Sequence, residues 1–169
     1  MTNADLTIRA AGDSDRAALE ALIAECYASV YPGWYDGELL GDALPAMLRI
    51  DPALLSSGRY LLASIGDELA GCGGWSAGAP KSGELTDGTG HVRHFATRTD
   101  LMGKGVGGAI LDRCVAEALH AGMSKLRCFS SLPAEKFYAR HGFSKLGDVR
   151  VMLGEGVYFP AVQMERGLG

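Results

Sequence analysis

Long apolar segments and basic runs are both absent from this chain of 169 residues. No apolar run reaches the roughly 18 residues that a membrane-spanning helix needs. Residues 1–5 also lack the basic and then apolar order of a secretory signal, so we expect a cytoplasmic protein with no membrane partner. The formal net charge is −4 and lysine and arginine form no run, which predicts no nucleic-acid partner.

Paired cysteines are also absent, because the four that occur are scattered without C-x-x-C spacing. Two of them, Cys26 and Cys114, fall on the apolar stripes of predicted helices, so we expect buried, reduced thiols. His91 and His94 are three residues apart in a predicted strand and would point to opposite faces of it. No cysteine or carboxylate nearby completes a ligand set with them, and we predict no metal.

Apolar residues, by contrast, are plentiful: they make up 47% of the sequence, which suits one globular domain over residues 1–169. Periodicity and turn residues predict the following order of elements: a strand at 6–9, a helix capped by Asp13, a helical stretch over 40–48 with Pro45 in its first turn, strands at 59–64 and 69–76, a loop at 77–90, a strand at 91–97, a glycine turn and a long helix, a strand at 125–131, a short helix at 133–141, and two strands in the tail.

The glycine turn is the most informative segment, with four glycines between residues 102 and 108 directly before the long helix. Glycine lets a backbone approach a ligand closely, and the first N–H groups of a helix have no partner inside it. Such a turn is typical of an anion or phosphate site. A second interpretation stays open, in which the glycines only permit close packing of the helix against a sheet.

Two nucleotide-binding patterns do not fit this turn. Gly103, Gly105 and Gly108 match G-x-G-x-x-G, but the next strand, residues 125–131, carries no carboxylate to hold ribose hydroxyls. A Walker motif requires Lys and then Ser or Thr after its last glycine, whereas Gly108 is followed by Ala109. We therefore exclude a nucleotide hydrolase.

The element order and three local motifs resemble the GNAT family of N-acetyltransferases. The family's acetyl-CoA loop, Q/R-x-x-G-x-G/A, corresponds to residues 102–107, with Met102 where the family usually has Arg or Gln. Residues 134–143 match the family block A-x-x-F-Y-x-x-x-G-F, and residues 162–165 look like its closing strand. The resemblance implies an α/β (α+β), GNAT-like fold with a mixed, mostly antiparallel sheet of about six to seven strands and about four helices.

By this resemblance the chain is an acyltransferase that uses acetyl-CoA as cosubstrate and moves the acetyl group directly to a primary amine through a tetrahedral intermediate. The strand at 95–97 would hold the oxyanion and the pantetheine, and backbone amides of the glycine turn would hold the pyrophosphate. Lys104 could add charge there or be a solvated lysine, and Ser131 could contact pantetheine or cap the short helix. The implied cofactor-binding residues are Phe95, Ala96, Thr97, Met102, Gly103, Lys104, Gly105, Val106, Gly107, Gly108 and Ser131.

Tyr138 matches the family tyrosine that hydrogen-bonds the departing sulfur, so it is the leading candidate for the catalytic acid. In the alternative interpretation, Phe137 and Tyr138 are simply the buried face of a short helix. His94 and His91 are candidates for the general base, because imidazole titrates near neutral pH, although either could be structural.

No motif in the sequence identifies the acceptor substrate. We expect a small-molecule amine, and the net charge of −4 favours a cationic acceptor only weakly. Trp34, Tyr35 and Trp75 could line an acceptor pocket or pack in the core. The resemblance also allows a homodimer. The alternative function is a non-catalytic acetyl-CoA-binding sensor with the same fold, which the unusual Met102 favours and the retained Tyr138 disfavours.

Overall fold

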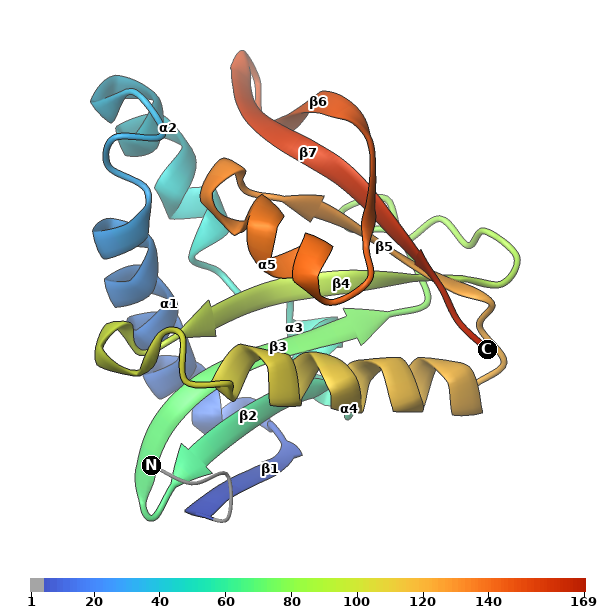
Figure 1. Ribbon diagram of the computed structural model, residues 1–169. Coiled ribbons are helices and arrows are strands. Elements are labelled where there is room, and N and C mark those ends of the chain that lie inside the picture. Colours follow the sequence, from blue (N-terminus) through green and yellow to red (C-terminus); the bar gives the residue numbers. More distant parts are fainter. Residues whose placement is uncertain (1–4) are drawn as a thin grey trace.

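A single seven-stranded sheet organises the computed structural model, which describes residues 5–169 (Figure 1). The strands lie in the order β1-β2-β3-β4-β5-β7-β6, and β4 with β5 is the parallel pair among otherwise antiparallel neighbours. The predicted mixed, mostly antiparallel sheet of six to seven strands is confirmed. Their bounds are β1 (Leu6–Ala10), β2 (Tyr60–Ile65), β3 (Glu68–Ser76), β4 (Thr89–Thr97), β5 (Lys125–Ser130), β6 (Ser144–Gly154) and β7 (Val157–Gly167).

Five α-helices flank this sheet within the described residues, one more than the sequence predicted. They are α1 (Arg16–Val30), α2 (Gly37–Met47), α3 (Pro52–Ser56), α4 (Val106–His120) and α5 (Glu135–Arg140). The unpredicted α3 is only five residues long, too short for a periodic pattern. Its signal was local: the Asp51 carboxylate accepts a hydrogen bond from the Ala53 N–H at 2.9 Å, and Pro52 occupies the first helical position.

Apolar residues on both faces of the sheet divide the core into two layers. In β2, Leu61 and Ala63 pack with residues of α4, whereas Tyr60 and Leu62 pack with residues of α1 and α2. Successive side chains of a strand point to opposite faces, so this continuous apolar run marks a strand covered on both sides. In Figure 1, α4 lies in front of β2 and β3.

The placement of Pro45 in a first turn was wrong. The helix begins at Gly37, directly after Asp36, whose backbone is extended (φ −62°, ψ 139°), so Pro45 lies in the last turn. Proline there removes one N–H donor to the preceding turn. The helix ends two residues later, at Met47.

The cap before α1 also differs from the prediction, because Asp15 and not Asp13 directly precedes the helix, and Asp13 makes only long contacts of 3.4 Å with Arg16. The Asp15 carboxylate accepts hydrogen bonds from the Gly12 N–H at 2.9 Å and from both terminal nitrogens of Arg9 at 2.9 and 3.0 Å. These contacts, with Arg9 first, lower the pKa of Asp15 to about 2.

Replacing Asp15 by asparagine should lower the free energy of unfolding by about 1 kcal/mol, a value that allows for solvent screening of the Arg9 pair. Because the folded-state pKa is depressed, this contribution is complete above about pH 4 and is lost as pH falls toward 2. Urea unfolding of both proteins across this range measures it. The Asp13→Asn control removes the charge of a side chain that is 89% exposed, so it should change stability by less than about 0.5 kcal/mol. Equal effects of the two substitutions would contradict the assignment.

The four cysteines are free and buried, as predicted. Burial raises the pKa of Cys72 and Cys128 to about 12. In residues 5–169, no helix has the length and apolar character needed to cross a membrane.

Candidate active site

The opening of the site lies where β4 and β5 separate. These strands pair only over Thr89–His91 and Lys125–Arg127. Beyond that point β4 continues to Thr97, still paired with β3 through Ala96 and Thr97 but no longer with β5. One edge of the β4 backbone over 92–97 is therefore left without a neighbouring strand, and its free polar groups can bind a ligand.

A β-bulge in β4 shapes this edge. Between the pairs Cys72–Ala96 and Gly74–Arg93, β4 has one residue more than β3, and His94 has a positive φ of 49°. The Tyr60 hydroxyl donates to the His94 carbonyl at 2.6 Å and fixes the bulge from the core. Bulges redirect side chains locally, so the simple alternation expected for His91 and His94 does not hold through this segment.

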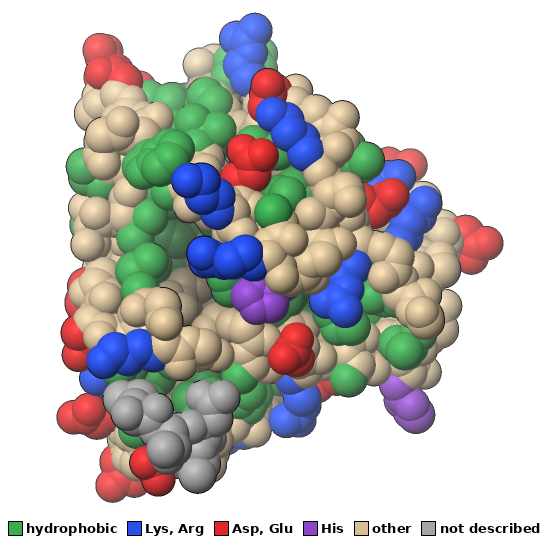
Figure 2. All heavy atoms as spheres, in the orientation of Figure 1, with side chains coloured by type: hydrophobic (Ala, Val, Ile, Leu, Met, Phe, Trp, Pro, Cys, Tyr) green, Lys and Arg blue, Asp and Glu red, His purple; other side chains and the backbone are tan. Residues whose placement is uncertain are grey.

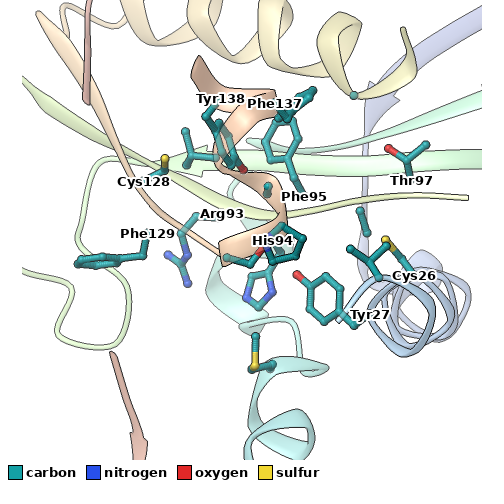
Figure 3. A pocket seen from close by; sticks show the side chains of 18 of the residues that line it. Cys26, Tyr27, Arg93, His94, Phe95, Thr97, Cys128, Phe129, Phe137 and Tyr138 are labelled. Carbon is teal, nitrogen blue, oxygen red and sulfur yellow. The ribbon is translucent and has the colours of Figure 1, made fainter. Parts of the chain in front are cut away.

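A cleft of about 1280 Å³ extends from the glycine turn across β4 to α1 and the loop before α3. Figure 2 shows a hollow bordered by basic side chains and a histidine, and Figure 3 shows side chains of β4, β5, α1 and α5 around the cavity. Most of the predicted site residues line it: His94, Phe95, Ala96, Thr97, Met102, Gly103, Gly105, Val106, Gly107, Gly108, Ser131 and Tyr138.

The geometry of the glycine turn suits both of the roles that the sequence left open. Gly103 and Gly105 have φ values of 77° and 89°, which favour glycine, and Gly105 is the residue before the first turn of α4. Gly107 and Gly108 permit close packing on the α5 segment: an added Cβ would lie 3.1 Å from the Phe137 ring and 2.7 Å from His141 Nε2. The turn thus packs closely while the first N–H groups of α4 remain at the cleft.

Tyr138 contributes a hydroxyl to the cleft from an apolar setting. Its ring packs against Phe95, Phe137 and Phe143, with centroids 5.1 to 6.3 Å apart. Among the described residues no group hydrogen-bonds the hydroxyl, although the side chain is only 6% exposed. Burial first, and then the neighbouring Cys128, raises the pKa of Tyr138 well above 10, so the phenol stays protonated and can donate.

The two histidines lie in different places. His94 lines the cleft, and burial, with Arg93 second, lowers its pKa to about 4, so its imidazole is neutral at physiological pH. His91 does not line the cleft. It is buried in the paired part of β4, and its Nε2 has no partner among residues 5–169. We therefore do not retain His91 as a base, because a substrate in the cleft does not reach it.

Two further predicted residues have different outcomes. Lys104 is exposed and does not line the cleft, so its position suits the interpretation as a solvated lysine. Ser131 lines the cleft and precedes the 3-10 turn Leu132–Ala134, but its side chain makes no capping hydrogen bond. Burial raises the pKa of the Tyr31 phenol, and the Ser131 hydroxyl is close enough to offset part of this rise, so it faces the cleft beside α1.

Of the two interpretations of Trp34, Tyr35 and Trp75, the structure does not support the acceptor pocket, since none of the three lines the cleft. Trp75 is 1% exposed and donates to Glu117 at 3.2 Å, Tyr35 donates to the Pro160 carbonyl at 2.8 Å, and Trp34 is on the surface. The core and the β7 backbone hold the first two in place. The aromatic residues that line the cleft outside the Phe95, Phe137 and Tyr138 cluster are Tyr27, Tyr31, Phe129 and Phe159.

Sequence reasoning also missed the charged lining. Six basic side chains border the cleft against two carboxylates, although the chain as a whole has a net charge of −4. Lys136 and Arg140 are four residues apart on α5, a spacing that places both on one helix face and was visible in the sequence. The others come from separate elements and had no common signal: Arg16, Arg49, Lys81 and Arg93, with Glu20 and Asp51.

Comparison with known proteins identifies the family. A sequence model of the acetyltransferase (GNAT) family matches residues 16–143, and the chain therefore belongs to that family, whose enzymes use acetyl-CoA as cosubstrate. No curated protein matches the chain at a significant level.

Solved structures show the same fold. A GCN5-related N-acetyltransferase from Rhodopseudomonas palustris has a TM-score of 0.77 at 19% identity, over 99% of each chain. The PaiA N-acetyltransferase from Thermoplasma acidophilum, solved with coenzyme A, has a TM-score of 0.73 at 16% identity, again over 99% of each chain. Ard1 from Thermoplasma volcanium has a TM-score of 0.66 at 15% identity, over 98% of this chain and 99% of its own.

The exposed Met102 should limit the affinity for acetyl-CoA, since it replaces the usual Arg or Gln at the mouth of the cleft. We expect Met102→Arg to lower the acetyl-CoA Kd about 3- to 10-fold through a charge-assisted contact, with a smaller gain at high salt. Isothermal titration calorimetry at two salt concentrations measures both. Lys104→Met is the control and should leave Kd within about 2-fold. No gain from the arginine, or a large loss in the control, would contradict this role of position 102.

Proposed function

We propose that this enzyme transfers the acetyl group of acetyl-CoA directly to the primary amine of a small molecule, without an acetyl-enzyme. The observation that carries the proposal is the convergence on one cleft of the α4 N-terminus, the unpaired edge of β4 and the Tyr138 hydroxyl. An acyl transfer to an amine needs three things: a site for the phosphates and pantetheine, a donor for the oxyanion, and a proton for the departing thiolate.

The residues at the glycine end of the cleft suit the charge of acetyl-CoA. First-turn amides of α4 and the side chains of Lys136 and Arg140 line the same part of the site, and both kinds of group bind phosphate. The unpaired β4 edge at Phe95–Thr97 supplies backbone groups for pantetheine and for the oxyanion, and Ser131 adds a hydroxyl.

Tyr138 is the proposed donor to the leaving sulfur. The amine attacks the thioester carbonyl, a tetrahedral intermediate forms, and its collapse expels the thiolate, which takes a proton. The raised pKa of Tyr138 keeps the phenol protonated while this negative charge develops. The absence of a hydrogen-bond partner among the described residues leaves the hydroxyl free to act.

His94 is the better placed candidate for the base, because it lines the cleft and its imidazole is neutral at physiological pH. The same low pKa makes this imidazole a weaker base than an exposed histidine. We expect His94→Gln to lower kcat/KM about 10-fold or more, since general bases contribute roughly 100-fold or more and water can replace part of this. His91→Gln is the control and should retain activity. Similar losses in the two variants would contradict a direct role for His94.

A thermal-shift titration with acetyl-CoA, with NADH as control, is the first test, because a ligand that binds only the folded state raises Tm. A rise with acetyl-CoA alone, followed by CoA release when a panel of amines is added, would support the proposal. Binding of acetyl-CoA without release of CoA in the presence of any amine would instead support the alternative function, a non-catalytic acetyl-CoA sensor. The unusual Met102 is the one specific observation that favours this alternative. No rise at millimolar acetyl-CoA would overturn both.

We also propose a cytoplasmic location, because the four free cysteines suit a reducing compartment. A homodimer stays a prediction from the family resemblance.

A further inference from the structure

The end of the cleft away from the glycine turn contains a buried cation, Arg93, that the proposed chemistry does not use. Arg93 is on β4 directly before the bulge at His94, and its side chain is only 9% exposed. Both residues line the cleft, and Figure 3 shows their side chains at the same cavity as Tyr138. A buried charge is costly unless it is paired and hydrogen-bonded, so its partners are informative.

Within the described residues the guanidinium is only partly satisfied. One terminal nitrogen donates to the Ser76 hydroxyl at 3.0 Å, and the other lies 3.9 Å from the Asp51 carboxylate, too far for a hydrogen bond. Guanidinium has five N–H donors in a planar fork that matches a carboxylate. Desolvation is the largest effect on the pKa of Arg93 and lowers it, so neighbouring charges do not fully compensate for its burial.

The nearby carboxylates have other partners. Asp51 accepts from the Ala53 N–H at 2.9 Å and caps α3, with half of its side chain exposed. Glu20 accepts from the Ile50 N–H at 2.9 Å and lies 3.5 Å from Arg16. Because these contacts anchor the two carboxylates to the backbone around residue 50, neither is free to move onto Arg93 as a close bidentate partner.

We propose that the acceptor carries a carboxylate close to its amine, as an α-amino acid does, and that this carboxylate binds the free N–H groups of Arg93. This inference rests on the proposed function, since it names the class of amine. It also reverses the weak preference for a cationic acceptor that the net charge suggested, because the lining of the cleft is basic. Arg93 would select the acceptor and orient its amine toward the acetyl group.

Equilibrium binding tests the inference without requiring turnover. Calorimetry would compare L-α-amino acids with their carboxamides on protein saturated with CoA. The amides have nearly the same shape, but an uncharged amide group replaces the carboxylate. We expect at least one amino acid to bind about 10- to 100-fold more tightly than its amide, the fold-change of a charge-assisted hydrogen bond. In Arg93→Met this ratio should fall to about 1, and Arg93→Lys should keep part of it.

Two controls separate selection from folding. Both Arg93 variants should keep the acetyl-CoA thermal shift, which reports on the other end of the cleft. Arg49→Met removes an exposed arginine of the same cleft and should leave the ratio intact. Equal binding of acids and amides by the unmodified protein, no binding of either, or a ratio that survives in Arg93→Met would overturn the inference. Loss of the ratio in Arg49→Met as well as in Arg93→Met would also overturn it, because the effect would then not be specific to Arg93.

Release of CoA, measured in parallel, distinguishes this inference from the proposed function. If the preferred amino acid binds through Arg93 but no CoA is released, direct transfer fails and the carboxylate site stands. If amines with and without a carboxylate are acetylated equally well, the transferase activity stands and the carboxylate site fails.

Discussion

Replacing Tyr138 by phenylalanine is expected to lower kcat for acetyl transfer about 100-fold, the contribution of one well-placed proton donor. The change removes a hydroxyl that makes no hydrogen bond within residues 5–169 and leaves the ring contacts with Phe95, Phe137 and Phe143 in place. Stability and acetyl-CoA affinity should therefore change little. The loss should appear in kcat and not in the KM for acetyl-CoA, because the interaction forms as the thiolate develops.

The pH dependence of this effect follows from the burial of Tyr138. Its pKa lies well above 10, so the phenol is protonated across the range in which the enzyme can be assayed. The ratio of the kcat values of the unmodified enzyme and the variant should then be constant from about pH 6 to about pH 9. A ratio that fell toward 1 in the upper part of this range would mean that Tyr138 loses its proton there, contrary to the structure.

Tyr27 provides a matched control for Tyr138. It is also a buried tyrosine that lines the cleft, but it belongs to α1, on the acceptor side. Tyr27→Phe should retain kcat within a few-fold. Equal losses in the two variants, or a Tyr138→Phe defect confined to acetyl-CoA binding, would remove the argument for a proton donor.

Local motifs made the cofactor end of this site predictable from the sequence. The glycine turn and the Phe137–Tyr138 pair are each defined by a few consecutive residues, so their spacing identified them, although their packing partners are distant in the sequence. The alternating and continuous apolar runs likewise identified the strands, because side-chain period follows directly from strand geometry.

The acceptor end was not predictable, because it depends on contacts between distant segments. The bulge at His94 depends on the register of β4 against β3 and on the Tyr60 hydrogen bond, and the residue with positive φ is a histidine where a glycine would have indicated a bulge. Arg93 was unremarkable in a strand until the structure placed it beside Ser76 and Asp51. Pro45 and Asp13 were misplaced for a different reason: several nearby residues could begin each helix, and the sequence pattern did not distinguish them from Asp36 and Asp15, which precede the helices in the structure.

Replacing Gly105 by alanine should weaken acetyl-CoA binding about 10-fold or more, equivalent to about 1.4 kcal/mol. Gly105 has φ 89° and immediately precedes α4, so a Cβ there is strained and the backbone that aims the first-turn amides must shift. Those amides are the proposed hydrogen-bond donors to the phosphates, and their position depends on Gly105.

Gly122, at the other end of the same helix, separates this effect from general destabilisation. Its φ is also 89°, and an added Cβ would meet no atom within 4 Å, so Gly122→Ala imposes backbone strain without a clash. Both variants should lose about 1 kcal/mol of folding free energy, whereas only Gly105→Ala should lose acetyl-CoA affinity in calorimetry. If the two bind acetyl-CoA equally well, the α4 N-terminus is not the phosphate site, and the cations Lys136 and Arg140 must hold the phosphates without it.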